Sequence, residues 1–235
     1  WHLIKNMIFD SKISDLYVVL YEMTTNILEE KLKYFSENNG KEVDIYALAK
    51  AYEIKIVKQN LESSQDIFSQ EVLGYLDSFY EKTIYINDTA GDYSKRYGVA
   101  HEIGHYLVKK EKHEDDQVFA CYYATPRLPK NAEEQICDII ASFLLMPVST
   151  VLDLMNEYIS EVGKLRKYEA TTYTWLEYLG EKLHIADYYT GLCFQNIRYL
   201  CAILYERAQE MKDEDIEKGS IYEKIKTENV ERLFR

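Results

Sequence analysis

The sequence has few of the residues that make loops. It contains 9 glycines and 3 prolines among 235 residues, and this scarcity argues against a disordered or loop-rich chain. By contrast, 47% of the residues are hydrophobic, which is ample for a packed core. A chain of this length can form one domain or two, because domains contain about 100–200 residues.

Cysteines are also few, and their spacing excludes two common roles. Cys121, Cys137, Cys193 and Cys201 form no C-x-x-C pair and no compact disulfide framework. Cys193 and Cys201 lie eight positions apart in a stretch with a helical pattern, which is too far for a bridge along one helix. We therefore expect all four cysteines to be reduced and the protein to be cytoplasmic.

Long apolar runs are missing, and basic residues are outnumbered. No apolar run approaches the ~18 residues that a membrane-spanning helix needs, and no signal-peptide pattern is visible, so no membrane association is expected. The chain has 28 basic and 40 acidic residues, which gives a formal net charge of −12. Because phosphate binding needs a basic surface, direct contact with nucleic acid is not expected either.

A short motif in the middle of the chain indicates metal chemistry. His101 and His105 are the histidines of an H-E-x-x-H pattern, with Glu102 between them. Residues four apart share one face of a helix, with Cβ atoms about 5–6 Å apart, so both imidazoles can bind one metal ion. Glu102 lies about 100° round the helix from His101, where it can reach a water at the metal and act as a general base. The pattern is short and also occurs by chance.

The surroundings of the motif favour a helix. Ala100, Ile103 and Leu107 follow helical spacing, and Asp92 can cap the start. Gly104 costs about 1 kcal/mol in a helix interior. That cost is explained if another element passes close by at this point.

A catalytic zinc ion needs a third protein ligand, and a second predicted helix offers one. This helix spans residues 131–146. Glu134, Asp138 and Ala141 lie on one line along it, apart from the core face. We interpret Glu134 as the third ligand and Asp138 as the acceptor for a ligand histidine N–H. Small Ala141 would let another helix approach closely, for which Gly104 is the natural partner.

Two alternatives concern the third ligand. Asn131 and Glu134 have the spacing of a capping-box variant, so Glu134 can instead satisfy a backbone N–H. His113 is another candidate ligand, but it lies in a charged run that reads as a solvated loop, so we do not favour it. A site of this type needs a third ligand, and this requirement favours Glu134.

The rest of the chain is mostly helical by pattern. Strands are predicted at residues 54–57 and in a hairpin at 71–87, and residues 111–130 are predicted to be irregular, as is a polar connection at 161–167. The stretch 179–200 weakly resembles a helix-turn-helix, but it has few basic residues, so we interpret it as a packing or interaction module. His184 within it is not expected to be a ligand. The remaining predicted helices span residues 11–38, 43–52, 148–158, 172–184, 187–210 and 213–227.

Two motifs together resemble the ImmA/IrrE family of metallopeptidases. The first is the H-E-x-x-H segment at 101–105. The second, at 134–147, reads E-x-x-C-D-x-I-A-x-x-L-L-M-P where the family has E-x-x-A-N/D-x-F-A-x-x-L-L-M-P. Cys137 and Ile140 replace the usual alanine and phenylalanine, but both lie on a packing face and neither is an expected ligand. The resemblance covers about residues 41–150, and the pair of motifs is far more specific than the first alone.

The resemblance implies a fold and an activity. It implies a small zincin-like α+β domain, and site-specific cleavage of a partner that is often a helix-turn-helix repressor. We therefore expect an α+β, predominantly helical protein with a short three-stranded antiparallel sheet. The metallopeptidase domain is assigned to residues 41–160, with an N-terminal helical segment (1–40) and a C-terminal helical interaction region (161–235).

The sequence thus predicts a zinc-dependent endopeptidase that cleaves a specific protein, with a transcriptional repressor as the expected substrate. His101, His105 and Glu134 are the predicted metal ligands, Glu102 the general base and Asp138 the group that orients a ligand. Manganese or iron can occupy the same ligands. The alternative is a non-catalytic regulatory protein that binds a transcription factor through its helical flanks, with a structural or absent metal.

Overall fold

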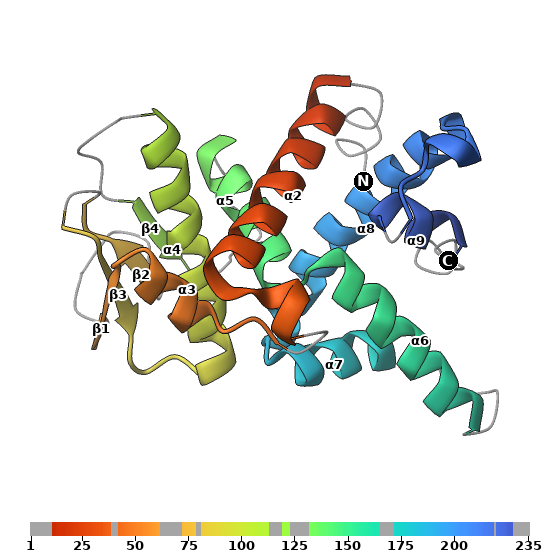
Figure 1. Cartoon of the computed structure of the whole chain (residues 1–235). Coiled ribbons are helices and arrows are strands. Elements are labelled where there is room, and N and C mark those ends of the chain that lie inside the picture. Colours follow the sequence, from red (N-terminus) through yellow and green to blue (C-terminus); the bar gives the residue numbers. More distant parts are fainter. Residues whose placement is uncertain are drawn as a thin grey trace.

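The computed structural model describes residues 11–38, 42–61, 72–78, 81–112, 119–122, 132–164, 172–218 and 220–227. Asn131, His113 and the side chain of Cys121, all discussed above, lie outside the described residues. The sheet lies at one end of the molecule and α8 and α9 at the other (Figure 1). In chain order the elements are α2 (Ser11–Leu32), η1 (Tyr34–Asn38), α3 (Ile45–Ala51), β1 (Lys55–Gln59), β2 (Val72–Leu76), β3 (Thr83–Asn87), α4 (Asp92–Lys112), β4 (Phe119–Tyr122), α5 (Ala132–Leu145), α6 (Val148–Lys164), α7 (Thr172–Leu183), α8 (Asp187–Glu210), η2 (Asp213–Asp215) and α9 (Ile221–Thr227).

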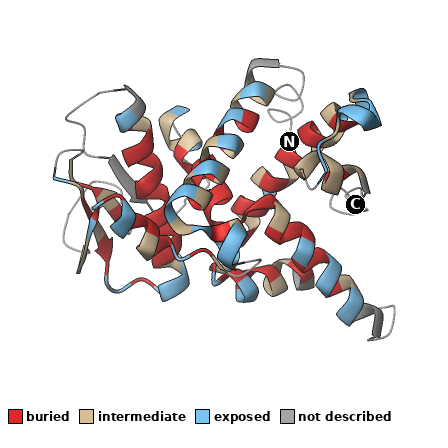
Figure 2. Ribbon diagram, viewed as in Figure 1, coloured by how far each residue is buried: buried red, intermediate tan, exposed pale blue. Residues whose placement is uncertain are grey.

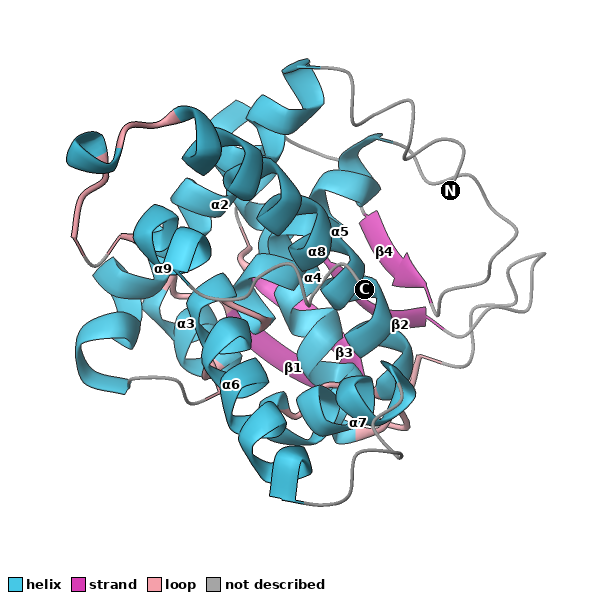
Figure 3. Ribbon diagram, turned by 90° about the vertical axis from the view of Figure 1, so that its right-hand side faces the viewer, coloured by secondary structure: helices cyan, strands magenta, loops and turns pink. Residues whose placement is uncertain are grey.

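The strands form one mixed sheet in the order β1-β3-β2-β4, and Figure 3 shows them side by side. β1 runs parallel to β3, whereas β2 is antiparallel to both of its neighbours. The α+β, predominantly helical class is confirmed. The expected three-stranded antiparallel sheet is corrected in two respects, because the sheet has a fourth strand and one of its pairs is parallel.

The fourth strand lies in a stretch that the sequence predicts to be irregular. β4 has only four residues, too few for an alternating pattern to stand out, and its pairing with β2 defines it. A smaller correction concerns α6, which continues to Lys164 into the predicted polar connection. The predicted hairpin is confirmed, with β2 and β3 paired in antiparallel register.

The middle of β2 contains a glycine that the sheet requires. A Cβ at Gly74 would lie 2.6 Å from the Cδ1 of Ile86 and 2.8 Å from the carbonyl oxygen of Tyr85. No side chain fits at these distances. A β-bulge between Val72 and Gly74 adjusts the pairing of β2 with β4 at the same point.

Helices α4 and α5 cross closely in the middle of the molecule, where buried residues concentrate (Figure 2). A Cβ at Gly104 of α4 would lie 3.1 Å from the Cα of Cys137 and 3.2 Å from its Cβ and carbonyl oxygen. The predicted close approach at Gly104 is therefore present. Its neighbour is Cys137, however, and not Ala141 as the sequence suggested.

A line of polar side chains connects the N-terminal helix to α5 through the interior. The hydroxyl of Tyr17 on α2 donates to Asn196 Oδ1 on α8, at 2.9 Å. Asn196 Nδ2 donates to Ser142 Oγ on α5, at 2.9 Å. Ser142 Oγ in turn donates to the backbone carbonyl of Asp138, at 2.6 Å. Elements from both ends of the chain thus meet at α5.

Three cysteines lie in this interior. Cys137, Cys193 and Cys201 are free and buried, in agreement with the prediction that they are reduced. Burial disfavours the thiolate and raises the pKa of Cys201 to about 12.

Among the described residues, no single helix has both the length and the apolar character needed to cross a membrane. α5 and α6 meet those two conditions only as a pair, which is bent by 54°.

The crossing of α4 and α5 can be tested by adding a side chain at Gly104. We expect Gly104→Val to lower the free energy of unfolding by about 1–3 kcal/mol, because the backbone of α5 cannot move aside without cost. Gly191→Val in α8 is the matched control, since a Cβ there meets nothing within 4 Å. Urea denaturation of both variants measures the difference, and equal stabilities would contradict the packing described here.

Burial of the Cys201 thiol predicts how the free energy of unfolding changes at alkaline pH. The unfolded chain releases this proton near the ordinary cysteine pKa of about 9, whereas the folded chain keeps it to about 12. The stabilising contribution is therefore complete below pH ~9 and declines as the pH rises toward 12, by about 1.4 kcal/mol per pH unit. We expect Cys201→Ala to show a correspondingly shallower alkaline decline in urea denaturation under reducing conditions. Parallel declines for the two proteins would refute the assignment.

Candidate metal centre

The two histidines of the motif lie on one face of α4, inside the protein. His101 is 1% exposed and His105 is fully buried, as is Glu102. The two imidazole ring centres are 5.0 Å apart. The i, i+4 spacing on a regular helix brings them together, as the sequence predicts.

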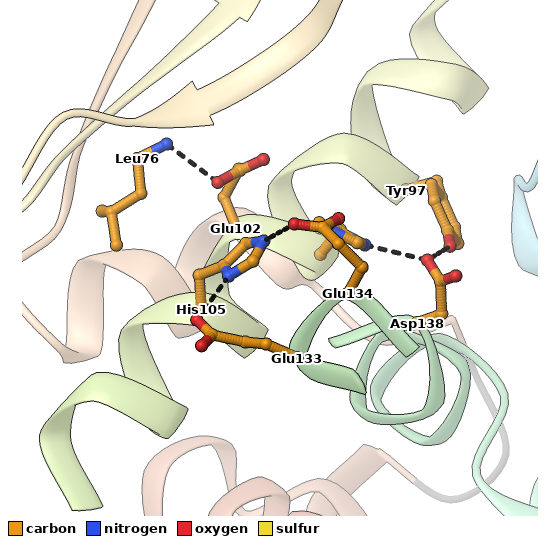
Figure 4. A network of polar contacts seen from close by, with 8 residues as sticks. Leu76, Tyr97, Glu102, His105, Glu133, Glu134 and Asp138 are labelled. Atoms are coloured by element: carbon orange, nitrogen blue, oxygen red, sulfur yellow. Dashed lines mark hydrogen bonds and ion pairs between the residues drawn. The ribbon is translucent and has the colours of Figure 1, made fainter. Parts of the chain in front are cut away.

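A single carboxylate from α5 reaches both imidazoles. Glu134 Oε2 lies 3.2 Å from His101 Nε2, and Glu134 Oε1 lies 3.2 Å from His105 Nε2. Figure 4 shows this carboxylate next to His105, with Glu133 and Asp138 on either side. The Nε2 atoms of both histidines and both oxygens of Glu134 therefore converge on one small region.

Each imidazole also contacts a second carboxylate through its other nitrogen. His101 Nδ1 donates to Asp138 Oδ1 at 3.0 Å, and His105 Nδ1 donates to Glu133 Oε1 at 3.3 Å. A hydrogen bond at Nδ1 fixes the ring and directs Nε2 toward the shared region. α5 thus provides an orienting carboxylate for each histidine.

Glu102 approaches the same region from α4. Its Oε2 accepts a hydrogen bond from the backbone N–H of Leu76 in β2, at 2.8 Å. Its Oε1 is buried and has no hydrogen-bond partner among the described residues. Ligand atoms of His101, Glu102 and His105 all lie within 4.8 Å of one another.

Burial and pairing act against each other on the charged groups. Burial lowers the pKa of His101, but hydrogen bonds to Asp138 and Glu134 outweigh this effect and raise the pKa to about 10. Burial would raise the pKa of Glu134, yet hydrogen bonds from the two histidines hold it well below its usual range. For Glu102 burial prevails, and its pKa is raised in spite of both histidines.

The chemistry of these groups fits a divalent metal ion. Two imidazole nitrogens and a carboxylate oxygen form the donor set of many catalytic zinc sites. Ligation needs the lone pair on Nε2, so any proton held there must leave when a metal binds. By distance alone Glu102 and Glu134 both qualify as the carboxylate ligand. Glu134 lies against both Nε2 atoms, whereas Glu102 is held by the sheet through Leu76.

A family comparison covers the whole of this site. The model of the peptidase M78 family, described as the IrrE N-terminal-like domain, matches residues 49–187. The chain belongs to the ImmA/IrrE family. The matched segment runs from α3 to the first residue of α8 and includes every group described above. A comparison with curated proteins finds no match.

As a member of the ImmA/IrrE family, the chain contains a metallopeptidase-type domain, and this family implies a protein substrate. All five residues selected from the sequence come together where α4 meets α5: His101, Glu102, His105, Glu134 and Asp138.

Sequence reasoning did not find the contact of Glu133, and one histidine lies away from the site. Glu133 contacts His105; its position beside Glu134 in the first turn of α5 was a usable signal. His184 lies in the turn between α7 and α8, where it contacts the carboxylate of Glu42 and stacks on Tyr93.

The two adjacent glutamates of α5 should differ in their effect on metal binding. We expect near-stoichiometric zinc in the wild type and loss of most of it in Glu134→Ala, because a ligand is removed. Glu133→Ala should keep the metal with about 10–100-fold lower affinity, because only the orientation of His105 suffers. Elemental analysis and chelator competition measure both quantities. Equal losses in the two variants would contradict the assignment of Glu134 as the ligand.

Proposed function

We propose that the protein is a zinc-dependent endopeptidase that cleaves a specific protein partner in the cytoplasm. In this proposal His101, His105 and Glu134 bind the metal, Glu102 is the general base, and Asp138 orients His101. Manganese or iron can take the place of zinc at these ligands.

One observation carries the proposal. The Nε2 atoms of two buried histidines face a single carboxylate at 3.2 Å each, and Glu102 lies within 4.8 Å of both imidazoles with one buried oxygen that has no described hydrogen-bond partner. An unsatisfied buried acceptor costs about 1–3 kcal/mol, so a purely structural ion-pair network gains nothing from an unpaired carboxylate oxygen. A general base, by contrast, needs a carboxylate oxygen that is available to accept a proton.

Each group at the site has a separate role in the proposed hydrolysis of a peptide bond. A zinc ion at the three ligands would polarise the peptide carbonyl and acidify a water. Glu102 accepts the proton of the attacking water at Oε1 and delivers it to the nitrogen of the leaving amine. The Leu76 N–H holds Oε2 in place throughout.

The sheet supplies a place for an extended substrate. β4 ends the strand order beside β2, and Phe119 of β4 is paired with Leu76, the residue that holds Glu102. A peptide added along the outer edge of β4 would run past the catalytic region with its backbone hydrogen-bonded to the strand. The edge thus selects extended, unfolded segments.

The choice of partner is assigned to the helices around the site. A helix-turn-helix transcriptional repressor is the partner that the family resemblance favours. In this proposal residues 41–160 form the metallopeptidase domain. The flanking segments, residues 1–40 and 161–235, present or select the substrate. No contact with nucleic acid or a membrane is part of the proposal.

A second function has one observation in its favour. The carboxylates of Glu134 and Asp138 already bond His101 on both ring nitrogens, and its pKa is about 10. Pairing of this kind offsets the cost of burying the charges without an ion, so the alternative is a non-catalytic regulatory protein that binds a transcription factor through its helices, with a structural or absent metal. Partner control in cells that survives loss of the general base would favour it.

The general base gives the decisive test of catalysis. We expect Glu102→Gln to abolish cleavage, with a loss of about 10²–10⁴-fold, and to leave the metal content unchanged, because the three ligands remain. Mass spectrometry of new protein N-termini in expressing cells, beside elemental analysis, measures both. Glu206→Gln, an exposed position on α8, is the matched control. New N-termini that persist in Glu102→Gln would contradict the mechanism, and loss of metal would contradict the ligand assignment.

A further inference from the structure

A tyrosine one turn before the motif bonds the carboxylate that orients His101. The hydroxyl of Tyr97 donates to Asp138 Oδ1 at 2.5 Å, and the contact is buried. The same oxygen accepts from His101 Nδ1 at 3.0 Å. One carboxylate oxygen thus receives a hydroxyl and an imidazole from successive turns of α4. Figure 4 shows Tyr97 beside Asp138.

The hydrogen bonds from Tyr97 and His101 together fix the orientation of the Asp138 carboxylate. A carboxylate rotates easily about the bond to its Cβ, and a single hydrogen bond leaves much of that rotation open. The second donor fixes Oδ1 between the two α4 side chains. The direction of the His101 ring, and with it the direction of Nε2, then depends on the tyrosine hydroxyl.

The ring of Tyr97 is itself held by the C-terminal part of the chain. It stacks on Tyr189 of α8, with ring centres 4.0 Å apart and planes 14° from parallel. Tyr97 is 2% exposed and Tyr189 is 4% exposed. Tyr189 lies two positions beyond the segment that the family model matches, so this support comes from outside the matched segment.

We infer that Tyr97 is a positioning residue for the metal centre, acting through Asp138 on His101, and that Tyr189 of α8 keeps it in place. The inference rests on the proposed function, because it concerns the same metal ligands. It adds that a residue outside the H-E-x-x-H motif and a helix of the C-terminal region both set the geometry of His101.

The test compares two tyrosine-to-phenylalanine variants. Tyr97→Phe keeps the ring and its stacking but removes the hydroxyl that reaches Asp138. Tyr34→Phe is the matched control, because its hydroxyl also makes a buried hydrogen bond, to Thr150 of α6 at 3.0 Å. Both variants lose one buried hydrogen bond, and only one of these bonds belongs to the metal centre.

Two measurements on the full chain separate positioning from general stability. The first is Zn²⁺ affinity by competition with a chromogenic chelator, and the second is the visible absorption spectrum of the protein loaded with Co²⁺. We expect about 10-fold weaker zinc binding and a shifted cobalt spectrum in Tyr97→Phe. Tyr34→Phe should keep the wild-type affinity and spectrum, with a similar loss of thermal stability. Tyr189→Leu should follow Tyr97→Phe with a smaller change.

Three outcomes overturn the inference, and they are distinguishable. Wild-type affinity and spectrum in Tyr97→Phe would show that the hydroxyl positions nothing. Equal weakening in Tyr34→Phe would show that metal binding merely follows overall stability. A wild-type protein that takes up neither Zn²⁺ nor Co²⁺ would overturn the proposed function itself, and this inference with it.

Discussion

The close crossing of α4 and α5 is the constraint on which the candidate metal centre depends. The helices approach so closely at Gly104 that an added Cβ would lie 3.1 Å from the Cα of Cys137. Only at this separation can the carboxylates of α5 reach the imidazoles of α4 at 3.0–3.3 Å. A shift of about 1 Å would break these hydrogen bonds, because such bonds end near 3.5 Å. The glycine is therefore a condition for the chemistry and not only for the packing.

Electrostatic compensation around this crossing is stronger at His101 than at Glu102. An isolated buried charge costs several kcal/mol. His101 and Glu134 offset that cost by pairing, so the pKa of the histidine is raised and that of the glutamate is lowered. Glu102 keeps a buried oxygen without a described hydrogen-bond partner, and burial raises its pKa. The unsatisfied acceptor is thus the group to which the proposal assigns proton transfer, and unsatisfied groups in folded proteins often mark such roles.

Sequence periodicity located most helices and the candidate ligand residues, but it merged α2 with η1 and η2 with α9 and did not show how the helices face each other. The bounds of α8 and the shared face of His101 and His105 follow from spacing along one helix. The neighbour of Gly104 depends on the rotation of α5 about its own axis, so Ala141 was assigned where Cys137 lies. The contacts of Glu133 and Tyr97 were missed for the same reason. β4 was missed because a four-residue strand gains its stability from pairing and not from its own pattern.

One set of hydrogen bonds also bears on the order of folding during synthesis. It runs from Tyr17 through Asn196 and Ser142 to the carbonyl of Asp138. Tyr17 and Asn196 are separated by 179 positions in the chain, and contacts of such long range form late and slowly during folding. During synthesis α4 and α5 emerge well before α8, whose side chains complete this line and support Tyr97. The hydrogen bond of Asn196 to Ser142 and the stacking of Tyr189 on Tyr97 can therefore form only after α8 has been made. Chain segments that end before α8 therefore carry the predicted metal ligands without the helix that supports Tyr97.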